Sequence, residues 1–175
     1  MTANRTALGT AALVAGSLIL LTEAAIEPGS PAPNFKLQDM AGRTVQLCDL
    51  RGRAVILHFW ASWCPRCVEE MPLLQEVNRD YGARGVRVLA LNLAEAPRRV
   101  GRYLKAHGLD LQILLDPKGD VAAKYGVTGL PMTIVIDPQG QILSRISMGS
   151  LDRNGIDTLL APFLTPPEKR DPPRR

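Results

Sequence analysis

The sequence predicts the α/β class, with a central mixed sheet flanked by helices, an N-terminal β-hairpin and an inserted βα element. Nearly continuous apolar runs, as at residues 54–60 and 86–92, are typical of strands that are covered on both faces. Helical patterns alternate with these runs, which indicates parallel strands joined by helices. The turn signal Asp-Pro-Gln-Gly at residues 137–140 instead joins two strands as an antiparallel pair. With 175 residues, 46% of them hydrophobic, the chain is long enough for one such domain.

Residues 1–26 are predicted to be a signal anchor or a signal peptide. An uncharged stretch at residues 7–21 is rich in Ala, Leu, Val and Ile, and it would span about 22 Å as a helix, short of the ~30 Å hydrocarbon core unless it extends to residue 26. The fit to a cleavage site is loose, so an anchor is favoured and cleavage stays open. Arg5 precedes the stretch, which places the N-terminus in the cytoplasm and the rest of the chain on the periplasmic face of the membrane, or in the periplasm after cleavage.

The other boundaries follow from proline content and periodicity. Residues 27–34 contain three prolines and predict a stiff, extended linker, whereas residues 165–175 contain four and predict a disordered tail. The domain is expected to cover residues 35–164, opening with a hairpin in which residues 35–38 and 44–47 alternate apolar and polar side chains. The later elements are expected as strands at 54–60, 86–92, 111–115, 133–136 and 141–148, and as helices at 65 to about 81, 96–107, 120–125 and 151–164.

The chemistry-bearing motif is Cys64-Pro65-Arg66-Cys67, between a buried strand and an amphipathic helix. A helix that begins at about Pro65 leaves Cys64 near unpaired N–H groups and the positive end of the helix dipole, which favour a thiolate. The cation of Arg66 has the same effect. The spacing puts Cys67 one turn deeper, close enough to attack a mixed disulfide at Cys64. The motif therefore predicts a redox pair in which Cys64 attacks and Cys67 resolves, with no metal or organic cofactor.

A Cys-x-x-Cys pair also occurs as half of a zinc site. The other candidate ligands in this chain are Cys48, His58 and His107, and no second Cys-x-x-Cys or His-x-x-x-His completes a tetrahedral shell. Redox chemistry is therefore favoured, and no metal is expected. Cys48 is interpreted as a buried small residue without a redox role. His107, which precedes Gly108, is expected at a helix C-terminus and without a catalytic role.

The formal net charge of +4 does not indicate a nucleic-acid partner. Four basic residues fall on the helix expected at residues 96–107, but Tyr103 is the only aromatic residue among them. A solvated helix face explains this stretch better than nucleic-acid binding. The four basic residues are Arg98, Arg99, Arg102 and Lys105.

Phe-Trp-Ala-Ser-Trp-Cys-Pro-Arg-Cys at residues 59–67, Pro72 and Gly-Leu-Pro-Met-Thr at residues 129–133 resemble the thioredoxin superfamily, over roughly residues 33–164. Glu70, the lead-in at residues 39–52 and an extra segment between residues 87 and 116 are similar to the membrane-anchored TlpA/ResA/DsbE branch. This resemblance implies a thioredoxin fold and an envelope protein-disulfide reductase, often one of cytochrome c maturation. It also implies two partners, a disulfide-containing client such as apocytochrome c and an upstream dithiol electron donor.

Further site residues follow from this resemblance and from position. The resemblance implies that Leu130-Pro131 is a cis bond beside the disulfide, where the freed backbone pairs with an extended substrate. It also implies that Glu70 lines the active-site cavity, where a carboxylate raises the thiol pKa and shuttles protons. Trp63 offers an apolar surface to a partner. His58 replaces the acid or amide usual at its position, and it is either a proton acceptor for Cys67 or a neutral, hydrogen-bonded core histidine.

Two other functions stay open. A copper- or metal-site assembly protein of the thioredoxin type usually has more widely spaced cysteines and an exposed distal histidine, neither of which is evident. A peroxiredoxin-like peroxidase is suggested by the lead-in at residues 33–59, but the Thr/Ser-x-x-Cys pattern is missing around Cys64.

Overall fold

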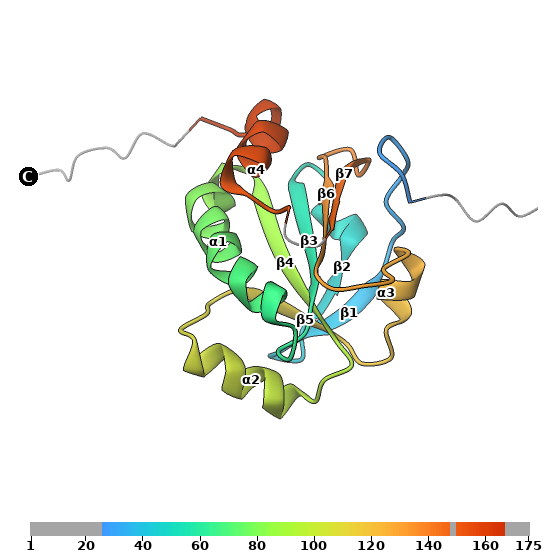
Figure 1. Ribbon diagram of the computed structural model, residues 1–175. Helices are drawn as coiled ribbons and strands as arrows, with labels where there is room; N and C mark the ends of the chain where they lie inside the picture. Colours follow the sequence, from blue (N-terminus) through green and yellow to red (C-terminus); the bar gives the residue numbers. More distant parts are fainter. Residues whose placement is uncertain (1–25, 148–149, 167–175) are drawn as a thin grey trace, which may run out of the picture.

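A computed structural model describes residues 26–147 and 150–166 and folds them around a seven-stranded sheet (Figure 1). The strand order is β2-β1-β5-β4-β3-β6-β7. The pairs β3–β4 and β4–β5 are parallel and the others are antiparallel, which confirms the predicted mixed sheet. The strands are β1 (Lys36–Asp39), β2 (Thr44–Gln46), β3 (Ala54–Trp60), β4 (Val86–Leu93), β5 (Gln112–Asp116), β6 (Met132–Ile136) and β7 (Ile142–Ser147).

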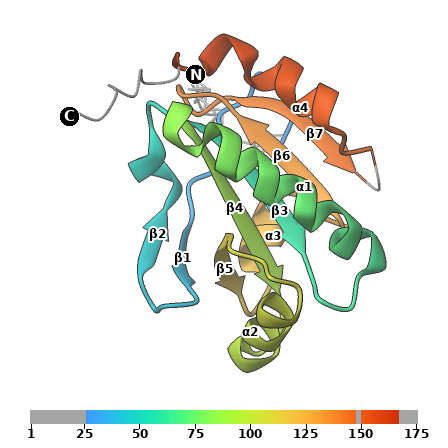
Figure 2. The same ribbon diagram turned by 90° about the vertical axis from the view of Figure 1, so that its left-hand side faces the viewer.

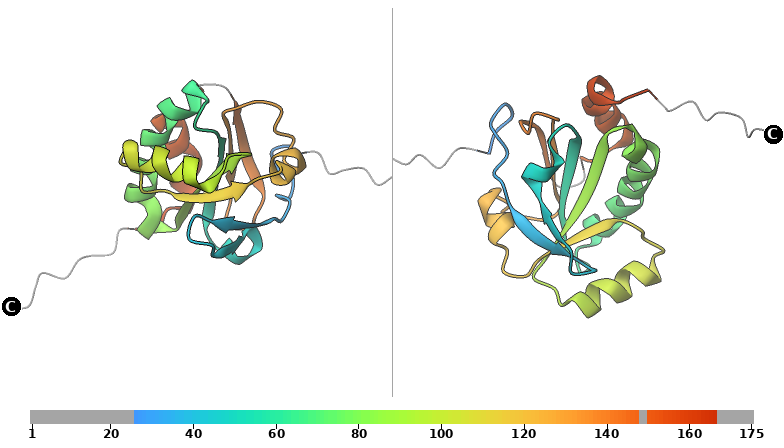
Figure 3. Two further views of the ribbon diagram at one scale, coloured as in Figure 1. Left: turned by 90° about the horizontal axis from the view of Figure 1, so that it is seen from below. Right: turned by 180° about the vertical axis from the view of Figure 1, so that it is seen from behind.

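Helices cover both faces of this sheet. Figure 2 shows α1 in front of β3 and β4 and α3 behind the sheet, and the view from below in Figure 3 places α1 and α4 together on the side opposite α3. This layered arrangement follows from the apolar runs of the central strands, which must be covered on both faces. The helices are α1 (Pro65–Tyr81), α2 (Pro97–Ala106), α3 (Asp120–Lys124) and α4 (Arg153–Leu160).

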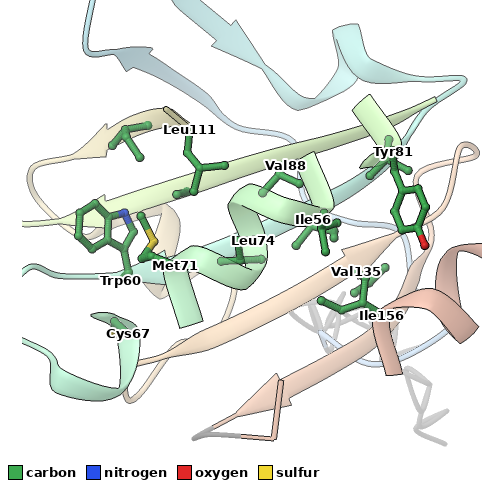
Figure 4. Packing of buried hydrophobic residues seen from close by; sticks show 14 of the residues in the cluster. Ile56, Trp60, Cys67, Met71, Leu74, Tyr81, Val88, Leu111, Val135 and Ile156 are labelled. Carbon is green, nitrogen blue, oxygen red and sulfur yellow. The ribbon is translucent and has the colours of Figure 1, made fainter. Parts of the chain in front are cut away.

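Strand β3 divides the core into two halves, and all of its residues are buried. Ile56 and Trp60 pack in the cluster on the α1 side, whereas Leu57 and Phe59 pack in the cluster on the α3 side. His58 lies between Ile56 and Trp60 on the same face of β3, because every second residue of a strand points the same way, and it therefore points toward α1. Figure 4 shows the α1 side, where the core runs along the helix from Cys67 and Met71 past Leu74 to Tyr81.

Helix α1 begins at Pro65 and ends at Tyr81, as the sequence predicts. Pro65 occupies the first turn, where its missing N–H would have no partner, and Pro72 lies inside the helix. Val68 and Asn78 of this helix are only half-buried. The buried residues of the helix are Cys67, Glu70, Met71, Leu74, Val77 and Tyr81.

The proline-rich segment at residues 26–34, which includes the stiff, extended linker predicted at residues 27–34, makes hydrogen bonds to the domain. The N–H of Gly29 donates to the carbonyl of Ile142 (2.8 Å), and the hydroxyl of Tyr125 donates to the carbonyl of Pro33 (2.6 Å). Arg145 Nη1 donates to the carbonyl of Ile26 (2.7 Å). This part of the chain is therefore hydrogen-bonded to the domain.

The last helix is shorter than predicted. Helix α4 begins after Asp152, whose side chain accepts from the N–H of Gly155 (2.8 Å), and a 3₁₀ turn at Ala161–Phe163 follows it. Pro162 lies in that turn, and a residue without N–H cannot continue the hydrogen-bond ladder of an α-helix. The apolar residues beyond position 160 extended the predicted helix too far.

Within residues 26–147 and 150–166, no helix combines the length and apolar character needed to span a bilayer. The signal segment predicted at residues 1–26 lies outside the described residues except for Ile26, as does the tail from residue 167. Both remain predictions.

Candidate active site

The two cysteines of the motif form a disulfide at the start of α1, with Cα atoms 5.3 Å apart. Cys64 is the N-cap residue in an extended conformation, and its sulfur accepts the N–H of Cys67 (3.2 Å). Cys64 keeps 5% of its surface exposed, whereas Cys67 keeps none. The disulfide is therefore less enclosed at Cys64 than at Cys67, and the assignment of Cys64 as the attacking and Cys67 as the resolving residue stays a prediction.

Two exposed side chains flank the disulfide. Trp63 is 62% exposed and presents a flat apolar surface immediately before Cys64. Arg66 is also exposed, but its guanidinium pairs with the carboxylate of Glu69 (3.2 Å), which weakens its field at the sulfurs. Trp63 is therefore an exposed apolar side chain beside the disulfide, and its contact with a partner stays a prediction.

Three polar residues from three elements meet beneath the first turns of α1. His58 of β3 is fully buried, with Nδ1 2.9 Å from the Thr133 hydroxyl of β6 and 3.8 Å from a carboxylate oxygen of Glu70 of α1. Its Nε2 has no hydrogen-bond partner among the described residues. Glu70 follows Cys67 by one helical turn and therefore lies on the same face of α1, and His58 of β3 approaches the Glu70 carboxylate.

Burial sets the charge state of the histidine. Loss of solvent disfavours the imidazolium and lowers the pKa of His58 to about 3. The ring is therefore neutral near pH 7, with Nδ1 hydrogen-bonded to the hydroxyl of Thr133. Such a ring gains a proton only when the charge is compensated, and Glu70 is the nearest carboxylate.

The residues before β6 lie beside the end of β3. Met132 pairs with Phe59, so Pro131 lies level with the last residue of β3, four residues before Cys64. The Leu130-Pro131 bond is cis, as the resemblance implies, and Pro131 is buried while Leu130 is half-buried. The predicted roles of these two residues in substrate binding stay predictions.

A second group of polar contacts, which sequence reasoning missed, holds the turn that leads into Cys64. The carboxylate of Glu95, in the loop after β4, accepts the backbone N–H and the hydroxyl of Ser62 (2.6 Å each). Asn92 Nδ2 and Arg99 Nε donate to the same carboxylate at 2.8 and 2.9 Å. Burial opposes the charge, but the bonds from Ser62 and Asn92 and the cation of Arg99 hold the pKa of Glu95 below its usual value. The available signal was a single acid, Glu95, three residues after the buried strand expected at residues 86–92.

The third cysteine corrects one expectation. Cys48 is exposed, not buried, in a 3₁₀ turn at Leu47–Leu50 that directs its side chain outward. His107 lies at the C-terminus of α2, as expected, and its Nδ1 donates to the carbonyl of Tyr103 (2.9 Å). Across the described ranges, no three His, Cys, Asp or Glu side chains gather as a metal site would require.

The sheet and the disulfide at the start of its first long helix together define a thioredoxin-fold dithiol protein. A similar solved structure is that of a Chlorobium tepidum protein assigned as the thiol:disulfide interchange protein DsbE, with a TM-score of 0.72 and 30% identity over 78% of this chain and 97% of that one. A thioredoxin-family thiol:disulfide interchange protein from Chlorobium tepidum TLS gives a TM-score of 0.68 at 26% identity, over 77% and 95%. The AhpC/TSA family matches residues 28–145, and this chain belongs to it.

Curated relatives are similar over a shorter stretch. The thiol-disulfide oxidoreductase ResA of Geobacillus thermodenitrificans is 40% identical over 103 residues, which are 59% of this chain and 59% of that protein. The protein of the same name from Bacillus subtilis is 35% identical over 103 residues, 59% of this chain and 58% of the relative. The chain therefore matches less than two thirds of the length of these relatives.

Proposed function

We propose that this chain is a thiol–disulfide oxidoreductase that reduces protein disulfides on the outer side of the cell membrane. The observation that carries the proposal is the Cys64–Cys67 disulfide at the start of α1, with its exposed edge at Cys64 alone. The thiol–disulfide names of the relatives and of the similar structures support the same activity.

The reaction has two exchange steps. The thiolate of Cys64 attacks one sulfur of the client disulfide, so that a mixed disulfide forms and the other client sulfur leaves as a thiolate. The thiol of Cys67 then loses its proton and attacks the Cys64 sulfur, which releases the second client thiolate. Two electrons pass to the client, and its two thiolates take up the two protons that the dithiol loses. An upstream dithiol protein must then reduce Cys64–Cys67 again.

The side chains around the pair fit these steps. The N-terminus of α1 stabilises the thiolate of Cys64, and the exposed ring of Trp63 gives the client backbone an apolar surface. His58 and Glu70 lie on the Cys67 side of α1 and are the groups available to accept its proton. The stretch before β6, with Leu130 and Pro131, is the proposed binding edge for an extended client segment.

The direction and the client are the finer parts of the proposal. The resemblance to the TlpA/ResA/DsbE branch favours a reductase, with apocytochrome c as the client. Equilibration with glutathione buffers measures the reduction potential of the pair. A reductase requires a potential well below that of a strong oxidant, so a value near about −120 mV would overturn the direction.

Trapping tests the activity itself. In the Cys67→Ala variant, Cys64 can form the mixed disulfide but nothing releases it, so covalent client adducts should accumulate and disappear with a thiol reductant. In a Cys48→Ser background, which removes the other exposed thiol, the matched Cys64→Ser variant should trap none. Adducts in both variants, or in neither, would contradict the proposed chemistry. Peroxide consumption and metal titration of the reduced protein test the two alternative functions directly.

A further inference from the structure

The residues before Cys64 form a β-turn. The N–H of Cys64 donates to the carbonyl of Ala61 (3.1 Å), so that Ser62 and Trp63 are the two central residues of the turn. The turn carries the exposed Trp63 at its tip and delivers Cys64 to the N-cap position of α1. The position of the Cys64 sulfur at the helix N-terminus therefore depends on how firmly this turn is held.

One buried carboxylate holds it. Glu95 Oε2 accepts the backbone N–H of Ser62 and Asn92 Nδ2, and Oε1 accepts the Ser62 hydroxyl and Arg99 Nε. Each oxygen thus receives two donors. A carboxylate can accept all of these bonds, but an amide cannot, because its nitrogen would face two donors.

The backbone before Glu95 brings its carboxylate to Ser62. Asn92, near the end of β4, pairs with Trp60 at the end of β3, which brings the two loops side by side. Ala94 then has φ = +55°, a left-handed conformation that residues other than glycine rarely adopt. Strained backbone of this kind persists only where surrounding contacts hold it, and it is concentrated at functional sites.

From these contacts we infer that Glu95 is a positioning residue for thiol–disulfide exchange: through Ser62 it fixes the 61–64 turn and so holds the Cys64 sulfur at the N-terminus of α1. The inference rests on the proposed function and deepens it. Glu95 bonds to neither cysteine, and its effect reaches Cys64 through the turn. Its loss should therefore change the reactivity of Cys64 more than it changes the stability of the fold.

The Glu95→Gln variant of the full chain tests the inference. The reduced protein is treated with a small alkylating reagent over a range of pH, and the rate at Cys64 is followed by mass spectrometry. We expect this rate at pH 7 to fall by roughly tenfold and its midpoint to move to higher pH, because a loosened turn no longer holds the sulfur at the helix terminus. Ser62→Ala, which loses only the hydroxyl bonds, should show a smaller change in the same direction, and Ser62→Thr should restore the wild-type rate.

Asp39→Asn is the matched control. Asp39 is also a buried carboxylate that accepts backbone N–H groups and pairs with an arginine four residues later, but in the β1–β2 turn. Its loss should lower the melting temperature and leave the Cys64 rate within about twofold of wild type. A folded Glu95→Gln protein with wild-type rate and pH midpoint would overturn the inference, as would equal rates in Ser62→Ala and Ser62→Thr if Glu95→Gln did not fold. An unreactive Cys64 in the wild type would instead contradict the proposed function.

Discussion

At the scale of single residues, the two sulfurs of the motif differ although they are three positions apart. Cys64 sits at the N-cap and keeps an exposed edge, while Cys67 is enclosed by the core on the α1 side. This difference could be predicted from the sequence, because it depends only on where the helix begins. What lies beneath Cys67 depends on β3 and β6, so the contact of His58 with Thr133 and Glu70 became evident only in three dimensions.

The burial of His58 predicts how the stability of the fold changes at low pH. Unfolded His58 gains a proton below about pH 6.5, but the folded residue stays neutral down to about pH 3, so this residue removes stability as the pH falls through that window. The loss is about 1.4 kcal/mol per pH unit. In His58→Asn, unfolding by urea at pH 7 and pH 4.5 should therefore show an acid loss smaller by about 2–3 kcal/mol than in the wild type.

His107→Asn is the control for that comparison, because it removes the exposed histidine at the end of α2 instead. It should keep the acid loss that His58→Asn removes. Equal losses in His58→Asn and the wild type would mean that the imidazole is not held neutral in the folded protein.

At the scale of elements, segments with a local signal were predicted well. The apolar run of β3 and the start of α1 at Pro65 carry their own signals, and both were placed correctly. Glu95 was missed because its partner Ser62 is 33 residues away. The sequence of a loop does not show which distant group a carboxylate in that loop contacts. The exposure of Cys48 was missed for a similar reason, since a 3₁₀ turn rather than composition decides it.

The contact between α1 and α4 gives a prediction at this scale. The hydroxyl of Tyr81, at the end of α1, donates to Asp157 of α4 (2.8 Å) and accepts from Arg153 (3.1 Å). Tyr81→Phe keeps the ring but removes both bonds, so the free energy of unfolding should fall by about 1 kcal/mol. Urea denaturation measures this difference.

Tyr103 provides the comparison for Tyr81. Its hydroxyl is buried without a hydrogen-bond partner in the described part of the chain, and desolvation raises the pKa of the phenol. Tyr103→Phe should therefore be neutral or stabilising. A loss of stability in Tyr103→Phe as large as that in Tyr81→Phe would contradict the account of both hydroxyls.

At the scale of the whole molecule, the folded domain includes residues 26–34, which lie before the domain boundary predicted at residue 35. The proline-rich residues 26–34 looked like a spacer, because proline content predicts stiffness but not what a segment packs against. In the structure they are bonded to Tyr125, Ile142 and Arg145, which come much later in the chain.

A truncation pair tests this boundary. A chain that starts at residue 35 lacks at least three hydrogen bonds between the segment and the domain, and its free energy of unfolding should be lower by about 2–4 kcal/mol than that of a chain starting at residue 26. Equal stability of the two chains in urea would mean that residues 27–34 act only as a linker and do not stabilise the domain.

The proposed chemistry depends on the reactivity of one sulfur, and the chain contains its own reference for measuring it. Cys48 is an exposed cysteine away from the motif. When the reduced, folded protein receives a brief pulse of iodoacetamide at pH 7, Cys64 should be alkylated several-fold faster than Cys48 because a larger fraction of it is thiolate, with Cys67 the slowest of the three. Alkylation of Cys64 that is no faster than that of Cys48 would contradict the account.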